Sequence, residues 1–139
     1  MTKRILIMGL PGSGKTTLAL NLMNLFNPNA IWLNADEVRK KYNDWDFSYE
    51  GRIRQSKRMR ELADLTQSKY VIADFVCPLP EMRSNYNPHF TVWVDTITEG
   101  RFEDTNRVFV APDYYNVRVT EQDAGKWAKE IYEQITHKI

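Results

Sequence analysis

The chain has 139 residues, of which 42% are apolar and 27% charged, and its formal net charge is +1. This length suits one compact domain, expected to span 1–139, and the composition excludes a disordered or membrane-embedded protein. The near-neutral charge gives no global field for nucleic acid or acidic membranes, so neither is expected as a partner. One cysteine, Cys77, rules out an internal disulfide and fits a reducing compartment. The apolar run at 5–8 is too short for a signal-peptide core, so we expect a cytoplasmic protein.

Short apolar runs alternate with amphipathic segments along the chain. The runs predict strands at 5–8, 30–33, 70–73, 90–94 and 117–119. Apolar residues at helical spacing predict helices at 16–26, 52–67 and 121–137. Strands that alternate with helices form βαβ units with parallel pairing. We therefore predict an α/β fold of three layers, in which a parallel sheet of about five strands carries helices on both faces.

The segment 96–115 shows no clear periodicity and is predicted to form one long loop. Structureless loops of this length are uncommon in compact domains and usually act as lids or binding loops. We expect a mobile cover over a cleft. Arg101 and Arg107 would then neutralise charge on a transferred phosphoryl group, and Phe102 or Phe109 would stack on an acceptor base. The alternative for the two arginines is an ordinary solvated loop position.

Residues 9–16 read Gly-Leu-Pro-Gly-Ser-Gly-Lys-Thr and fit the P-loop pattern G-x-x-x-x-G-K-[ST] in full. The glycines let backbone N–H groups surround a β-phosphate, and the helix that follows points its positive end at the same anion. Lys15 is expected to bridge the β- and γ-phosphates, and the Thr16 hydroxyl to ligate Mg²⁺. The residues predicted to bind ATP are Gly9, Pro11, Gly12, Ser13, Gly14, Lys15, Thr16 and Thr17.

Features outside the P-loop narrow the function. The sequence lacks the Asn-Lys-x-Asp motif of guanine-specific switches and is too short for an ATPase motor. A kinase of small molecules is the interpretation that remains. Asp74 ends an apolar predicted strand and fits the acidic residue that steadies Mg²⁺ in P-loop enzymes. A capping or turn role is the alternative for Asp74.

Three segments after the P-loop carry a resemblance to a known family. They read Leu-Asn-Ala-Asp-Glu-Val-Arg at 33–39, Phe-Ser-Tyr-Glu-Gly-Arg at 47–52, and Phe-Val-Cys-Pro-Leu-Pro-Glu-Met-Arg at 75–83. Together with the P-loop they resemble the adenylylsulfate (APS) kinases, which pair it with Leu-Asp-Gly-Asp-x-x-Arg, Gly-Phe-Ser-x-x-x-Arg and Ile-Ser-Pro-Tyr-x-x-x-Arg in the same order. The resemblance implies strand order 2-3-1-4-5 and ATP-dependent phosphorylation of the ribose 3′-hydroxyl of adenylylsulfate.

The resemblance also implies roles on the acceptor side. It places Asp36 at the catalytic aspartate, Arg39 and Arg52 at the arginines that hold the charged groups of the sulfonucleotide, and Phe47 at the aromatic beside the acceptor base. Gln55 stands where the family has a substrate-contacting asparagine. Phe75 and Cys77, in the third segment, complete the predicted acceptor site. Read from the residues alone, Asp36 is alternatively the N-cap of a helix that begins at Glu37, and Cys77 is alternatively a small packing residue.

The chain departs from the family pattern at several places. Asn34 replaces the first aspartate, Ala35 the glycine, Cys77 the serine and Leu79 the tyrosine, and the lysine-rich family lid is shortened and rewritten after Asp95. We therefore keep two alternatives: a kinase of the same fold for a nucleoside, nucleotide or polynucleotide end, and a non-enzymatic ATP-binding module. The predicted partner is a nucleotide-like small molecule, and the sequence leaves open whether the protein forms a homodimer.

Overall fold

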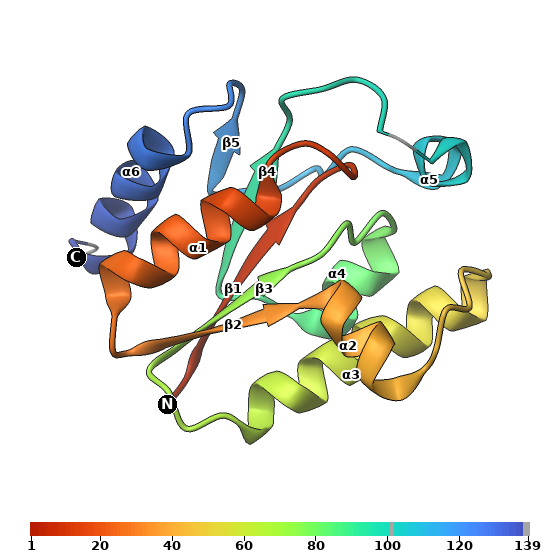
Figure 1. Ribbon diagram of the computed structural model, residues 1–139, viewed down its shortest axis with the longest axis horizontal. Coiled ribbons are helices and arrows are strands. Elements are labelled where there is room, and N and C mark those ends of the chain that lie inside the picture. Colours follow the sequence, from red (N-terminus) through yellow and green to blue (C-terminus); the bar gives the residue numbers. More distant parts are fainter. Residues whose placement is uncertain (101, 138–139) are drawn as a thin grey trace.

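The predicted strands form one parallel sheet in the structure, a computed structural model that describes residues 1–100 and 102–137. They are β1 (Lys3–Met8), β2 (Ala30–Asn34), β3 (Tyr70–Asp74), β4 (Phe90–Val94) and β5 (Val117–Val119). Their order is β2-β3-β1-β4-β5, as the family resemblance implied. Figure 1 shows that all five strands point the same way, so the loops that leave them gather at one edge of the sheet.

The strands are paired in a register that aligns their carboxyl ends. Asn34, the last residue of β2, pairs with Asp74, the last residue of β3, and Asp74 also lies opposite Ile7 of β1. On the other side of β1, Met8 lies opposite Trp93 of β4. Ligand sites of open parallel sheets lie outside this carboxyl edge, so the register determines which side chains meet there.

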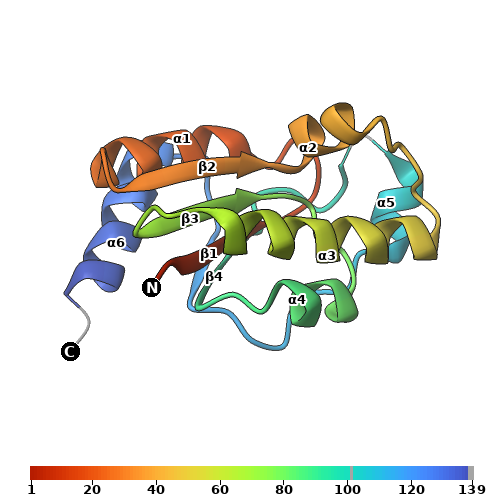
Figure 2. The ribbon, with the colours of Figure 1, turned by 90° about the horizontal axis from the view of Figure 1, so that it is seen from below.

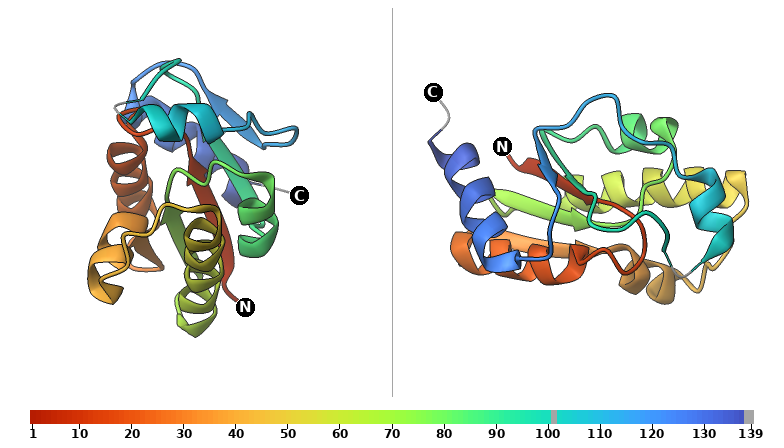
Figure 3. Two further views of the ribbon diagram at one scale, coloured as in Figure 1. Left: turned by 90° about the vertical axis from the view of Figure 1, so that its right-hand side faces the viewer. Right: turned by 90° about the horizontal axis from the view of Figure 1, so that it is seen from above.

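Side chains alternate across β1 and divide the core into two layers. Ile5 and Ile7 face α1 (Lys15–Phe26) and α6 (Ala124–Thr136), while Leu6 and Met8 pack toward the other helices. That second layer is built from α3 (Tyr49–Leu65) and α4 (Pro80–Tyr86), with the apolar side of α2 (Ala35–Tyr42). Figures 2 and 3 show the resulting helix–sheet–helix sandwich. Continuous apolar runs are expected for strands that are covered on both faces.

Helix boundaries correct several sequence expectations. The first turn of α2 is capped by Asn34, whose side chain accepts a hydrogen bond from Glu37 N at 3.0 Å, so the capping alternative for Asp36 is wrong. Helix α3 begins three residues earlier than predicted because the Ser48 hydroxyl caps it by accepting from Gly51 N. The Pro-initiated helix α4 was not predicted.

Among the residues described, no helix is both long and apolar enough to span a bilayer.

The segment 96–115 contains a short helix, α5 (Glu103–Val108), where one structureless loop was predicted. Thr105 is the buried residue of this helix, and its other positions are polar or partly exposed. A helix with so little buried surface leaves no apolar periodicity in the sequence, which is the signal that the prediction requires.

Docking of α6 on the sheet is expected to carry a large share of the stability of the first layer. Ile131 of α6 is fully buried among residues of α1 and the sheet. Ile131→Ala should lower the free energy of unfolding by about 2–5 kcal/mol, since it removes methyl groups and leaves a cavity. The exposed neighbour Lys129 supplies the control, because Lys129→Ala should stay within about 0.5 kcal/mol. Urea unfolding measures both, and equal effects would contradict the packing described.

Candidate active site

The P-loop connects β1 to α1 at the carboxyl edge of the sheet. Gly12 and Gly14 have φ values of 86° and 104°, a region that residues with a side chain rarely adopt. A Cβ on Gly9 would lie 2.5 Å from the carbonyl oxygen of Val94, too close for any side chain. Gly14 also caps the start of α1, so the loop ends where the positive end of the helix begins. The backbone therefore has the shape that holds a phosphate group.

The side chains of the loop fit the phosphates of ATP. Lys15 is buried, and its Nζ donates a hydrogen bond to the carbonyl oxygen of Leu10 at 3.0 Å, which holds the ammonium group within the loop. The Ser13 hydroxyl is buried with no hydrogen-bond partner among the residues described. Buried hydroxyls normally have a hydrogen-bond partner, so the Ser13 hydroxyl could donate to an additional acceptor such as a phosphate oxygen. Pro11 is buried in the loop, whereas the side chain of Thr17 is exposed.

Two residues that the sequence analysis missed brace the loop from outside. The Thr96 hydroxyl donates to the carbonyl oxygen of Ser13 at 2.7 Å, and Gln122 Nε2 donates to the same oxygen at 3.2 Å. Gly100 lies so close to Pro11 that a Cβ there would come within 2.9 Å of its ring. Thr96 is the second residue after β4, so the strand-end rule that singled out Asp74 could have drawn attention to this position. No sequence pattern distinguishes Gln122.

Thr16 and Asp74, the two predicted metal ligands, are in contact. The Thr16 hydroxyl donates to Asp74 Oδ2 at 2.8 Å, and Asp74 is buried at the end of β3, where it caps no helix. Within the described ranges, no three acidic, histidine or cysteine side chains are grouped so that they could hold a metal ion. One hydroxyl and one carboxylate fit Mg²⁺, which retains water and takes phosphate oxygens as ligands in kinases.

The predicted acceptor residues Arg39, Phe47 and Arg52 form one cluster. The guanidinium carbon of Arg39 lies 4.2 Å from the centre of the Phe47 ring, and that of Arg52 lies 5.6 Å from it. Both arginines are buried, and burial lowers the pKa of each guanidinium group. Phe47 is half exposed and offers a ring face flanked by positive charge. Asp36 is exposed on the first turn of α2, on the same helix as Arg39.

Three other predicted acceptor residues point into the interior. Gln55 is buried and donates through Nε2 to the carbonyl oxygen of Ala35 at 3.0 Å, which ties α3 to the start of α2. Phe75 is buried and packs edge-on against the ring of Tyr86. Cys77 is fully buried, and burial raises the pKa of its thiol, in agreement with the packing interpretation. Substrate contact by these residues stays a prediction.

Helix α5 lies beside the acceptor side. The carboxylate of Asp104 acts electrostatically on Arg52, so the two segments are close. Arg107 is exposed and pairs with Glu103 of its own helix at 3.2 Å, which orients it along the helix surface. Arg101, the other arginine predicted to reach the phosphoryl group, lies outside the described residues. Figure 3 shows α5 at the same end of the molecule as the first turns of α3.

The C-terminal part of the predicted lid is hydrogen-bonded to α4 and to the residues just before it. Arg83 Nη2 donates to the carbonyl oxygen of Val110, and Val110 N donates to the carbonyl oxygen of Pro78 at 2.8 Å. Phe109 is half-buried and lies against the Arg83 guanidinium, 5.5 Å from its carbon to the ring centre. Phe102 is exposed at the start of α5. Of the two aromatic residues, Phe102 is therefore the more exposed.

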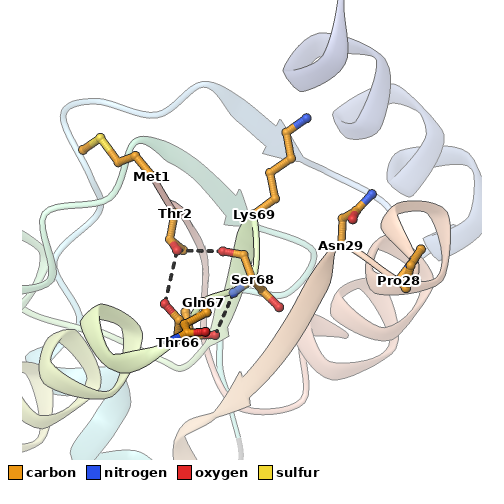
Figure 4. Close-up of a pocket in the computed structure, with 8 residues that line it drawn as sticks. All are labelled: Met1, Thr2, Pro28, Asn29, Thr66, Gln67, Ser68 and Lys69. Carbon is orange, nitrogen blue, oxygen red and sulfur yellow. Dashed lines mark hydrogen bonds between the residues drawn. The ribbon is translucent and has the colours of Figure 1, made fainter.

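A wide polar hollow of about 820 Å³ lies at the opposite, amino edge of the sheet (Figure 4). Its lining comes from the chain start and from the loops before β2 and β3, with Lys69 as the one charged side chain among the lining residues. The P-loop and the acceptor cluster lie at the other edge. Size alone does not make this hollow the active site, because the phosphate-binding groups converge elsewhere.

Comparisons with known proteins agree with this geometry. A sequence profile of the adenylylsulphate kinase family matches residues 1–110. The chain is similar to the APS kinase CysC of Mycobacterium tuberculosis in complex with AMPPNP and APS, at 20% identity and a TM-score of 0.80, with 96% of this chain and 97% of that one covered. It is also similar to the shikimate kinase from Acinetobacter baumannii in complex with shikimate, at 18% identity and a TM-score of 0.67, with 100% and 96% covered. No curated protein matches the chain significantly.

Loss of the P-loop lysine should strongly slow phosphoryl transfer and spare the fold. Lys15→Ala removes a charge that belongs to the phosphate site, so we expect kcat for ATP consumption to fall about 10²-fold to 10³-fold. Melting temperature should change little. Lys57→Ala, which removes an exposed lysine of α3, serves as the control and should keep full activity. Near-normal turnover by Lys15→Ala would contradict the phosphate-site assignment.

The segment 99–112 should close over the site when both substrates bind. Hydrogen exchange, measured with and without an ATP analogue and acceptor, is expected to show new protection around α5. The residues next to Val110 should already be protected in the free protein, because Arg83 and Pro78 hold them. Strong protection of the whole segment without ligand would mean a fixed structural element, and Arg107→Ala should then leave turnover unchanged.

Proposed function

Because the chain belongs to the adenylylsulphate kinase family, whose members are ATP-dependent P-loop kinases, we propose that it transfers the γ-phosphate of ATP to the 3′-hydroxyl of adenylylsulfate. The observation that carries this proposal is the cluster of Arg39, Phe47 and Arg52 beside Asp36. An aromatic ring suits a nucleotide base, and guanidinium groups suit its sulfate and phosphate. A carboxylate next to them suits a hydroxyl that must lose a proton.

In this reaction the P-loop holds and orients ATP. The backbone amides of the loop and Lys15 bind the β- and γ-phosphates, while Thr96 and Gln122 keep the loop from moving by holding the Ser13 carbonyl oxygen. Mg²⁺ at Thr16 and Asp74 would neutralise charge on the phosphates. Catalysis by positioning and charge neutralisation requires these groups to be rigid before the substrate arrives.

The acceptor is held by the cluster on α2 and α3. Arg39 and Arg52 use part of their donor capacity on backbone carbonyl oxygens of the loop at 43–48, which fixes them beside Phe47. The carboxylate of Asp36 would accept the proton of the acceptor hydroxyl as the oxygen attacks the γ-phosphorus in line. Closure of the segment with α5 would exclude water, so that the phosphoryl group passes to the acceptor and not to solvent.

A different hydroxyl acceptor is the second candidate. The altered segment after Asp95, with α5 in place of the lysine-rich family lid, changes the part that covers the acceptor. Solved kinases of similar fold include a shikimate kinase and a gluconokinase, so this fold supports other acceptors. The other alternative, a non-enzymatic ATP-binding module, does not agree with membership of a kinase family.

Replacement of Asp36 should separate transfer from nucleotide binding. Asp36→Asn keeps the shape and removes the proton acceptor, so we expect kcat with adenylylsulfate to fall about 10²-fold or more while ATP affinity is preserved. Glu37→Gln is the matched control, because Glu37 is the next acidic residue on the same exposed turn. Labelled ATP with a panel of acceptors, including adenylylsulfate, shikimate, gluconate and nucleosides, measures the transfer.

Three results would count against parts of this proposal. Transfer to another acceptor, with none to adenylylsulfate, would favour the second candidate. Equal activity of Asp36→Asn and Glu37→Gln would remove Asp36 from the mechanism. A loss of ATP affinity in Asp36→Asn, with unchanged turnover of the bound complex, would move Asp36 to the nucleotide side.

A further inference from the structure

Three side chains donate hydrogen bonds to one oxygen of Asp74. Asp74 Oδ2 accepts from the Thr16 hydroxyl at 2.8 Å, from Asn34 Nδ2 at 3.1 Å and from Trp32 Nε1 at 3.3 Å. Asn34 and Asp74 are paired residues of neighbouring strands, and Trp32 lies two residues before Asn34 on the same face of β2. Two donors therefore come from β2 and one from the first turn of α1.

The two donors on β2 orient the carboxylate and cannot replace it as a metal ligand. The indole N–H of Trp32 is a donor only, and the Asn34 amide nitrogen likewise has no lone pair to offer a cation. The other end of the Asn34 amide, Oδ1, accepts from Glu37 N at 3.0 Å. A carboxylate as deeply buried as Asp74, at 2% exposure, requires such donors, because burial of an unpaired charge is costly.

We propose that Trp32 and Asn34 are positioning residues, which hold Asp74 beside Thr16 for the Mg²⁺ of bound ATP, and that this site requires a neutral donor at position 34. The proposal rests on the Mg²⁺-dependent function proposed above. A carboxylate at position 34, as in the family pattern Leu-Asp-Gly-Asp, would replace the donor with a second negative charge about 3 Å from Asp74 Oδ2. Such a pair needs a cation between its members.

Asn34 also joins the two halves of the site. One end of its amide holds the carboxylate of the metal site, and the other caps the helix that carries Asp36 and Arg39. A single planar group therefore sets the distance between the metal carboxylate and the first turn of α2. Positioning of this kind matters because phosphoryl transfer is sensitive to small displacements of the reacting groups.

Calorimetry of ADP binding, in EDTA and then in Mg²⁺, tests the positioning role. In Trp32→Phe and Asn34→Ser, affinity in EDTA should stay within about twofold, while the gain in affinity on adding Mg²⁺ should shrink about tenfold, as for a lost hydrogen bond to a charged group. Serine keeps the helix cap, so α2 is spared. Trp127→Phe is the matched control, because the Trp127 indole N–H has no partner among the described residues.

Thermal melting without nucleotide tests the requirement for a neutral residue. Asn34→Asp keeps both shape and cap, so it should fold. We expect its melting temperature to lie several degrees below that of the native protein in EDTA and to return to the native value in millimolar Mg²⁺. The native protein should melt at the same temperature with and without Mg²⁺. So should Asn24→Asp, which adds the same charge at an exposed position of α1 and serves as the control. Equal melting temperatures of Asn34→Asp with and without Mg²⁺ would overturn the requirement for a neutral residue at position 34.

Asp74→Asn distinguishes failure of this inference from failure of the proposed metal site. If Asp74→Asn loses the Mg²⁺ gain while Trp32→Phe and Asn34→Ser keep it in full, the metal site stands and the positioning role is wrong. If the native protein shows no Mg²⁺ gain, or Asp74→Asn retains it, the metal site itself is wrong and the inference falls with it. If all three variants lose the Mg²⁺-dependent gain in ADP affinity and keep their affinity in EDTA, both the metal site and the positioning role are supported.

Discussion

The parallel pairing of β1 between β3 and β4 is the constraint on which the rest of the structure depends. Because the three strands are aligned at their carboxyl ends, the P-loop, Asp74 and Thr96 emerge at one edge. The pairing of Asn34 with Asp74 brings β2, and with it the acceptor helix α2, to the same place. The polar groups of the site thus lie at the ends of these strands or at the start of the helices and loops that follow them.

The nucleotide side and the acceptor side are supported in different ways. Around the P-loop, hydrogen bonds from Thr96 and Gln122 fix the backbone that we propose faces the phosphates. Around the acceptor, Arg39 and Arg52 are buried yet remain against the exposed ring of Phe47. A rigid phosphate site with a more open acceptor site agrees with a fold that many kinases share while they differ in acceptor. Asn34, which contacts both sides, links these two supports.

Much of the candidate site was accessible from the sequence, because its residues follow strands or belong to a contiguous motif. The P-loop needed only the order of strand, glycines and helix, and Asp74 was singled out because it ends an apolar strand; the structure brings it into contact with Thr16. The cluster of Arg39, Phe47 and Arg52 came from the family resemblance. Burial of Gln55 and Phe75 could not be foreseen in the same way, since a motif states which residues occur together and not which of them face the interior, whereas the packing interpretation of Cys77 did anticipate its burial.

By itself, the sequence determined the α/β class, the five strands and the position of the P-loop, because buried parallel strands and P-loops leave continuous, local patterns. Only the tertiary structure decided the contacts between segments far apart in the chain. The bonds from Gln122 to the P-loop, from Arg83 to Val110, and from Trp32 and Asn34 to Asp74 are of this kind. Helix α5 belongs with them, since six mostly polar residues carry no periodic signal. Such contacts depend on packing in three dimensions, which spacing along the chain does not record.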